Sequence, residues 1–97
     1  MKSSSFQKSF EKVHKRLQSI LRRKHFLITD DDVESGTIKA KRKGILFRSD
    51  ILINVTIRKI DNTSTQVSIT ADSQKKLFRV SEKRLRNIEG NILSVIS

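Results

Sequence analysis

Apolar side chains that recur at every second position place the tightest limit on how this chain can fold. The clearest example lies in residues 50–60, where every second side chain from Ile51 to Ile57 is apolar. Residues 37–43 and 65–72 repeat the pattern. Side chains alternate between the two faces of a strand, so each of these segments has one face to bury and one to leave in water.

Two segments with apolar residues at steps of three and four flank these strands. This spacing predicts helices over residues 5–24 and 81–96, because it places side chains on one side of a 3.6-residue helix. Ser4 with Gln7 fits a capping box for the first helix, and Ser81 is a candidate N-cap for the second. The stripes consist of Phe6, Phe10, Val13, Leu17, Ile20 and Leu21 in the first helix and of Leu85, Ile88, Ile92 and Ile96 in the second.

Polar clusters mark the connections between these elements. A short strand is predicted over residues 25–29, and the acidic residues 30–32 should end it in a turn. Residues 61–64 form a turn by composition. The polar and basic residues 73–79 are expected to form a loop. The predicted order is therefore one helix, four strands and a second helix.

These elements predict one small α+β domain spanning residues 1–97, a two-layer sandwich with the order α-β-β-β-β-α. Short turns pair successive strands antiparallel. Because each strand has one apolar face, both helices should cover the same side of the sheet and leave the other side open to water. The open side is expected to display Lys39, Lys41, Lys43, Asn54, Thr56, Arg58, Gln66, Ser68 and Thr70.

Several stretches also carry a resemblance to a known family; they are residues 38–42, 46–47, 50–51, 65–73 and 84–88. In these stretches the chain resembles a bacterial and plant domain family of unknown function, the fourteen-ninety-nine type. That family pairs a strand ending in Arg-Ser-x-Ser with a short loop and an arginine-rich helix. Ala71-Asp72-Ser73 occupies the corresponding place here. The resemblance implies the fold and supplies no activity.

The chain has a large excess of positive charge, with 21 Lys and Arg against 10 Asp and Glu and a net charge of +11. A field of this size attracts anionic partners. The chain has no Cys, which excludes disulfides and thiolate metal sites. No stretch is typical of a signal peptide or a membrane span, so we expect a cytoplasmic location without stable membrane insertion.

Lysines at positions 39, 41 and 43 should form a basic ridge about 13 Å long on the open sheet face. We expect a small noncatalytic binding or accessory module for an anionic protein or ligand, with nonspecific nucleic-acid binding as the alternative. Partners for base stacking are few, since only Phe47 and Phe78 fall in expected loops. The candidate anion-binding residues are Lys39, Lys41, Lys43, Arg58, Lys75, Lys76 and Arg79.

Patterns for other functions are weaker. The acidic run 30–32 with Glu34 offers oxygen ligands, but the spacing of a calcium loop is absent and a solvated turn is favoured. His14 and His25 lack the neighbours of a catalytic triad, and there is no glycine-rich phosphate loop. We therefore expect no enzyme, no bound metal and no cofactor. Membrane binding through residues 5–24 would require the apolar stripe of that helix to leave the core.

Two charged residues interrupt the apolar faces. Arg42 shares the inward face of its strand with Ile38 and Ala40, and Glu89 lies within the apolar arc of the second helix. An unpaired charge in the core is costly. These two residues should therefore either pair at the edge of the core or each reach water along its own stem.

Overall fold

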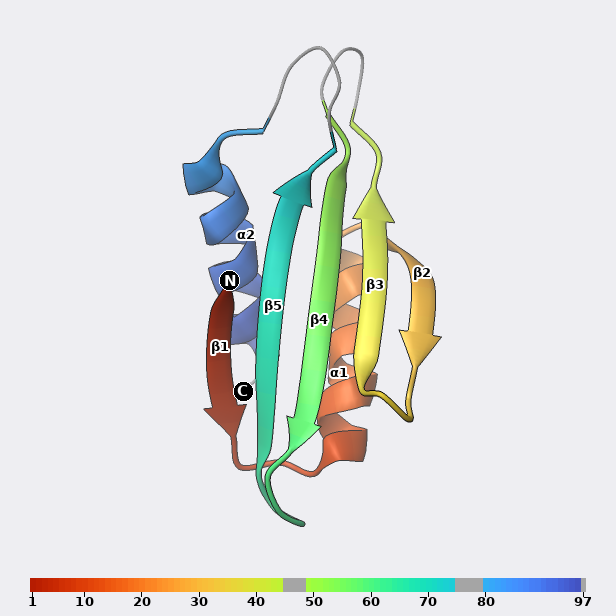
Figure 1. Ribbon diagram of the computed structural model, residues 1–97, viewed down its shortest axis with the longest axis vertical. Helices are drawn as coiled ribbons and strands as arrows, with labels where there is room; N and C mark the ends of the chain where they lie inside the picture. The colour runs from red at the N-terminus through yellow and green to blue at the C-terminus, as the bar shows by residue number, and fades with distance from the viewer. Residues whose placement is uncertain (45–48, 75–79, 97) are drawn as a thin grey trace.

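A computed structural model describes residues 1–44, 49–74 and 80–96. One layer is an antiparallel sheet with the strand order β1-β5-β4-β3-β2, and both helices lie behind it in Figure 1. This confirms the predicted α+β sandwich with one covered sheet face. The elements are β1 (Lys2–Phe6), α1 (Phe10–Arg23), β2 (Leu27–Asp32), β3 (Thr37–Arg42), β4 (Ile51–Lys59), β5 (Thr65–Ser73) and α2 (Glu82–Ile96).

Strand β1 is an element that the sequence analysis did not predict. The helix expected from residue 5 begins only at Phe10, and Ser4 lies in β1 opposite Val67 instead of capping a helix. The N-cap is Ser9, whose hydroxyl accepts a hydrogen bond from the Lys12 amide at 3.4 Å. Phe6 has the spacing of the helical stripe, yet it reaches the core from β1. This coincidence of spacing explains the wrong helix start.

The second strand also differs from its prediction. It begins at Leu27 and continues through the acidic residues 30–32, which pair with β3 and do not form a turn. His25 has a positive φ of 65° and lies between α1 and β2. The Phe26 amide donates to the Leu21 carbonyl at 2.9 Å, which satisfies an acceptor at the end of the helix. His25 therefore reverses the chain, and the strand starts later than its composition indicated.

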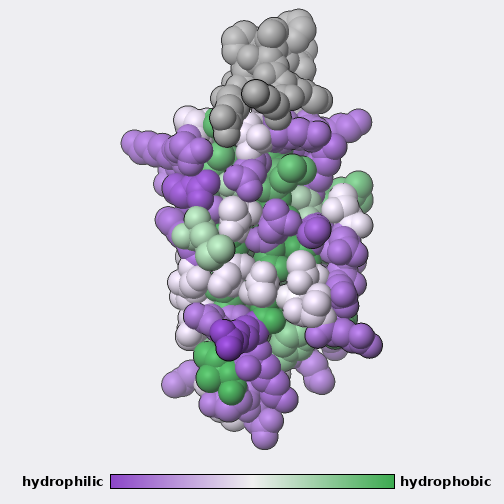
Figure 2. Space-filling view, in the orientation of Figure 1, coloured by the Kyte–Doolittle hydropathy of each residue, from purple (hydrophilic) through white to green (hydrophobic). Residues whose placement is uncertain are grey.

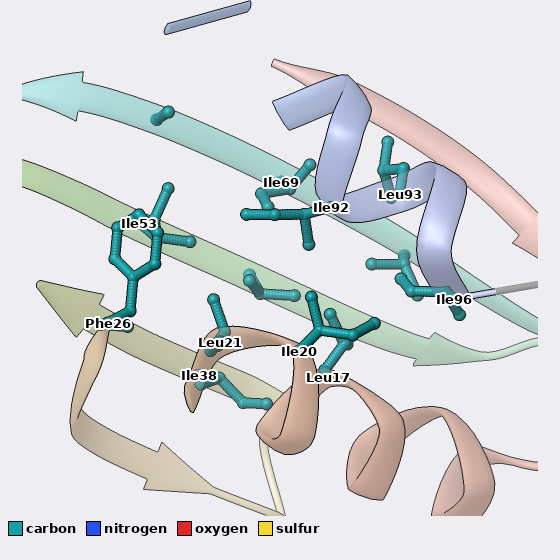
Figure 3. Close-up of a cluster of buried hydrophobic side chains, with 14 of the residues drawn as sticks. Leu17, Ile20, Leu21, Phe26, Ile38, Ile53, Ile69, Ile92, Leu93 and Ile96 are labelled. Atoms are coloured by element: carbon teal, nitrogen blue, oxygen red, sulfur yellow. The ribbon is translucent and has the colours of Figure 1, made fainter. Parts of the chain in front are cut away.

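The core lies between the sheet and the helices, as the alternating patterns predicted. Helix α2 packs on β5 and β1, and α1 packs on β4, β2 and α2. Figure 3 shows side chains from both helices pointing at the covered face of the sheet. The labelled members of this cluster are Leu17, Ile20, Leu21, Phe26, Ile38, Ile53, Ile69, Ile92, Leu93 and Ile96.

The start of α2 agrees with the sequence prediction. The Ser81 hydroxyl accepts from the Arg84 amide at 3.3 Å, and its carbonyl accepts from the Leu85 amide at 3.1 Å. Val80 is partly buried against the core. Helix α2 is thereby held with its first turn at the end of the sheet where β3 ends (Figure 1).

Candidate anion-binding surface

The predicted basic residues that the structure describes lie on β3, directly after β3 and on β4. Lys39 lies on the open sheet face in β3, Lys43 follows the end of that strand, and Arg58 lies on β4. All three are exposed. Arg58 pairs with Gln66 of β5. The first residue of β3, Thr37, pairs with Thr56, so Arg58 lies two residues beyond the part of β4 that pairs with β3. The remaining candidates, Lys75, Lys76 and Arg79, lie outside the described residues.

Lys41 has a carboxylate partner. Its Nζ lies 3.3 Å from Asp50 Oδ2, and the side chain of Asp50 is only 3% exposed. The other oxygen of Asp50 accepts from the Gly44 amide at 2.9 Å, and its carbonyl accepts from the Gln74 amide at 2.9 Å. Asp50 thus ties the ends of three strands together, and Lys41 supplies its counter-charge. The positive charge of Lys41 is largely compensated within the fold.

The open sheet face carries charges of both signs. Lys39 is paired across the sheet with Asp30, and Thr37 with Asp32. Asp72 is exposed on the same face, opposite Leu52. The middle of this face is pale in Figure 2, where one register row consists of Ser3, Ser68, Thr56 and Thr37. This face is therefore polar and hydroxyl-rich, with little net charge.

Uncompensated basic side chains gather on α1 instead. The helix exposes five cations and one carboxylate, Glu11. None of the five forms an ion pair with a described residue, and Arg16 donates from Nε to the Val95 carbonyl of α2 at 3.3 Å. We call these five residues the α1 basic surface: Lys12, Lys15, Arg16, Arg22 and Arg23.

Arg42 and Glu89 do not pair, so that predicted alternative is wrong. Arg42 stacks its guanidinium on the ring of Phe26, 4.7 Å from the centroid, and donates to the Lys24 carbonyl at 3.2 Å. Glu89 is fully buried and pairs with Arg86 at 2.8 Å. Arg42 contacts Phe26 and Lys24, whereas Glu89 pairs with Arg86 of the same helix.

The surroundings of Arg42 disfavour its positive charge. Burial lowers the pKa of Arg42, and the nearby positive charge of Arg84 lowers it further. Neither arginine forms an ion pair within the described ranges, and the hydrogen bond that joins Arg84 to Ser81 comes from the Arg84 backbone amide. Burial is therefore the main reason why the charged form of Arg42 is disfavoured. The alternating pattern of β3 marks Arg42 as a break in the apolar face.

His14 and Asp31 form the closest pair of titratable side chains on the other flank of α1. His14 Nε2 lies 2.8 Å from Asp31 Oδ1, and Gln18 donates to Oδ2 at 2.6 Å. The hydrogen bond from His14 is the main cause that lowers the pKa of Asp31, with a smaller contribution from Gln18. The ring of Phe10 stacks on His14 with centroids 6.1 Å apart. The hydrogen bonds of Asp31 with His14 and Gln18 thus connect β2 to α1.

A shallow surface pocket of about 370 Å³ lies between the start of α1 and the turn that joins β4 and β5. It is lined by Gln7, Lys8, Ser9, Lys12, Asn62 and Thr63.

No group of three or more His, Cys, Asp or Glu side chains in the described residues could hold a metal ion. No helix in the described ranges is long and apolar enough to cross a membrane.

By sequence, no protein family and no curated protein matches the chain. The resemblance to the fourteen-ninety-nine family thus stays a prediction. By structure, the chain is similar to a chain of the adenylate sensor from AMP-activated protein kinase, crystallised in complex with 5-aminoimidazole-4-carboxamide 1-beta-D-ribofuranotide. The TM-score is 0.72 at 10% identity, over 96% of this chain and 93% of the other. At this identity the similarity establishes the fold alone.

Proposed function

We propose that this chain is a small noncatalytic binding module whose α1 basic surface binds an acidic segment of a partner protein. One observation carries the proposal: five exposed cations lie on a single helix, and none forms an ion pair with a described carboxylate, although the charge of Arg22 also acts on Asp31. By contrast, the lysine in the middle of the expected sheet ridge is neutralised by Asp50. We therefore expect anions to bind on the helical layer and not on the open sheet face.

The α1 basic surface is held rigid by the opposite side of the same helix. Val13, Leu17, Ile20 and Leu21 are at most 2% exposed. Undocking the helix would return these four side chains to water at a cost of about 6–12 kcal/mol. A fixed array of cations favours a partner that binds from solution over one that requires the apolar stripe to be released. This supports a protein partner over insertion of α1 into a lipid surface.

One further feature supports an acidic protein over a nucleic acid. The described aromatic side chains, Phe6, Phe10 and Phe26, are buried or partly buried, so they offer no platform on which bases could stack. The fold also occurs in an adenylate sensor crystallised with a ribofuranotide, which is in keeping with a binding role but names no ligand for this chain.

Fluorescence anisotropy with two labelled polyanions of equal length tests the proposal. One is a polyglutamate peptide and the other a single-stranded DNA, each of about 20 units, titrated near 50 mM and near 200 mM salt. We expect polyglutamate to bind and its affinity to fall as salt rises. Binding of DNA without polyglutamate would favour the nucleic-acid alternative, and binding of neither at the lower salt would refute the proposed function.

A further inference from the structure

We propose that the α1 basic surface binds a helical segment whose carboxylates recur at a heptad spacing. This partner uses the same cations as the proposed function, on which the inference rests, and adds the conformation of the acidic segment and the spacing of its charges. The basis is a repeat within α1. Two groups of three positions have the same internal spacing and lie seven residues apart: Lys12, Lys15 and Arg16, and then Ser19, Arg22 and Arg23.

All six positions lie on one exposed face of α1. At 3.6 residues per turn they cover an arc of about 120°, with Ser19 between cations on both sides. The opposite face carries Leu17, Ile20 and Leu21, which point toward the sheet in Figure 3. The repeat therefore lies on the outside of the helical layer, where a partner can reach it.

The distance between the two groups distinguishes a helical partner from an extended one. Seven residues of an α-helix rise about 10.5 Å. A partner helix that lies along α1 repeats its own face with the same rise, so its acidic residues can meet both groups in the same way. In an extended segment, side chains on one face recur about every 6.6 Å, and neither one nor two such steps match the repeat. The spacing therefore favours a helix.

Ser19 leaves room for the partner at the centre of this face. It is the one position of the six without a long side chain. Because the distance between packed helices depends on the side chains at their contact, a partner helix can approach α1 more closely over Ser19 than over an arginine. The cations then flank the line of contact, with Lys15 and Arg22 on one side and Arg16 and Arg23 on the other.

Arg16 is oriented before a partner binds. Its Nε donates to the Val95 carbonyl of α2 at 3.3 Å, which uses one of the five N–H donors of the guanidinium. An arginine held in this way loses less conformational entropy when it binds a carboxylate. The hydrogen bond also connects the basic face to α2, so one charge of the repeat is fixed relative to the rest of the fold.

Two peptides of identical composition test the helical partner. Each consists of Glu, Ala and Gln over two heptads, about 14 residues, a length at which an isolated helix is marginal in water. The patterned peptide carries Glu at positions i, i+3 and i+4 of each heptad, and the scrambled peptide spreads the same Glu residues over all faces. Because the pattern reads the same in both chain directions, the test holds for either orientation of the partner.

The two measurements are fluorescence anisotropy at about 50 mM salt and circular dichroism. We expect the patterned peptide to bind at least about fivefold more tightly than the scrambled peptide and to gain helix on binding. Proline in place of a central Gln of the patterned peptide prevents the helix without changing the charge. This third peptide should lose the advantage of the pattern.

Arg22→Gln tests the repeat in the protein, because Arg22 is exposed and is the counterpart of Lys15 in the second group. The preference for the patterned peptide should fall to about half or less. Lys15→Gln, at the matching position, should have the same effect. Lys39→Gln removes the same charge from the open sheet face and should leave the preference unchanged.

The helical partner is overturned if the patterned peptide fails to bind, binds no more tightly than the scrambled peptide, or binds without a gain in helix. Equal effects of Arg22→Gln and Lys39→Gln on the preference would also overturn it. A chain that binds polyglutamate but shows none of these preferences retains the proposed function and loses only the helical, heptad-spaced partner.

Discussion

The backbone amide of Ala71 in β5 donates a hydrogen bond to Glu89 Oε2 of α2 at 2.7 Å. The Ala71 carbonyl accepts from Arg86 Nη2 at 3.0 Å, and Arg86 is paired with Glu89 at 2.8 Å. Strand β1 pairs with β5 only as far as Ile69, so it cannot satisfy these backbone groups. Glu89 and Arg86 of α2 therefore supply the hydrogen bonds that a neighbouring strand residue would otherwise make to Ala71.

Replacement of Glu89 should destabilise the fold strongly. Glu89→Ala removes the acceptor of a buried amide and the partner of Arg86, for which we expect a loss of about 3 kcal/mol in the free energy of unfolding. Glu89→Gln keeps an acceptor for Ala71 and should cost less. Urea unfolding followed by circular dichroism measures both values.

Glu82 provides the matched control for Glu89, because it contacts the same arginine at 3.4 Å but its side chain is 75% exposed. Glu82→Ala should change the free energy of unfolding by less than about 0.5 kcal/mol. If Glu82→Ala and Glu89→Ala lowered the free energy of unfolding by similar amounts, the hydrogen bonds from Glu89 and Arg86 to Ala71 would contribute nothing to stability.

Asp31 should make the stability of the fold depend on pH in acid. Its pKa is lower in the native state than its ordinary value, mainly because of the hydrogen bond from His14. The resulting stabilisation is present above the ordinary pKa of about 3.9 and is lost as the pH falls through the lower native pKa. Asp31→Asn should therefore lower the free energy of unfolding near pH 6 and show a smaller further loss on acidification.

Urea unfolding near pH 6 and near pH 3 measures this dependence. The control is Asp30→Asn, which removes the same charge from the adjacent, exposed position. This variant should keep the acid-dependent loss that Asp31 causes in the parent chain. Identical pH dependence for the parent chain and Asp31→Asn would contradict the role given to the His14–Asp31 pair.

The helix start makes a simple prediction about two serines. Ser9→Ala should destabilise the chain by about 1 kcal/mol, because it removes the hydroxyl that caps α1. Ser4→Ala, at the position that the sequence pattern suggested as a cap, should cost less than half as much, since Ser4 lies in β1. Thermal unfolding of both variants distinguishes the two helix starts. A larger loss for Ser4→Ala would support a helix from residue 5.

Two glycines should respond to alanine with opposite signs. Gly36 has a φ of +70°, and an added Cβ would lie 2.2 Å from the Ile57 carbonyl oxygen. Gly36→Ala should therefore cost at least about 2 kcal/mol. In α2, a Cβ at Gly90 would meet only the flexible end of Lys2 at 3.1 Å, so Gly90→Ala should stabilise the helix by up to about 1 kcal/mol. Urea midpoints for the two variants on the same side of the parent value would contradict this assignment.

The strands with alternating apolar residues and the helix with Ser81 at its N-cap could be predicted from the sequence, because their patterns reflect burial on one face. Strand β1 could not, since Ser3, Ser4 and Ser5 show no apolar alternation. Its only apolar signal, Phe6, continued the stripe of the following helix. What makes β1 a strand is the unpaired edge of β5, a tertiary feature that local spacing does not encode.

The charged residues show a similar division. The sequence located the cations but did not reveal their partners, which lie far away along the chain. Lys41 is compensated by Asp50, and Asp31 faces α1 from within a segment whose composition is typical of a turn. Arg42 was recognisable as an exception on an apolar face, but its support on Phe26 depends on the reversal of the chain after α1. Net charge alone could not distinguish the sheet face from the helical face.

The central claim is that anions bind the α1 basic surface and not the open sheet face, and two variants of equal charge test it most directly. One carries Lys12→Gln, Lys15→Gln and Arg23→Gln on the helix, and the other carries glutamine at the exposed sheet-side positions of Lys39, Lys43 and Arg58. The measurement is the dissociation constant for polyglutamate near 50 mM salt. We predict a loss of at least about tenfold for the helix variant and less than about threefold for the sheet variant. Equal losses, or a larger loss for the sheet variant, would contradict the account.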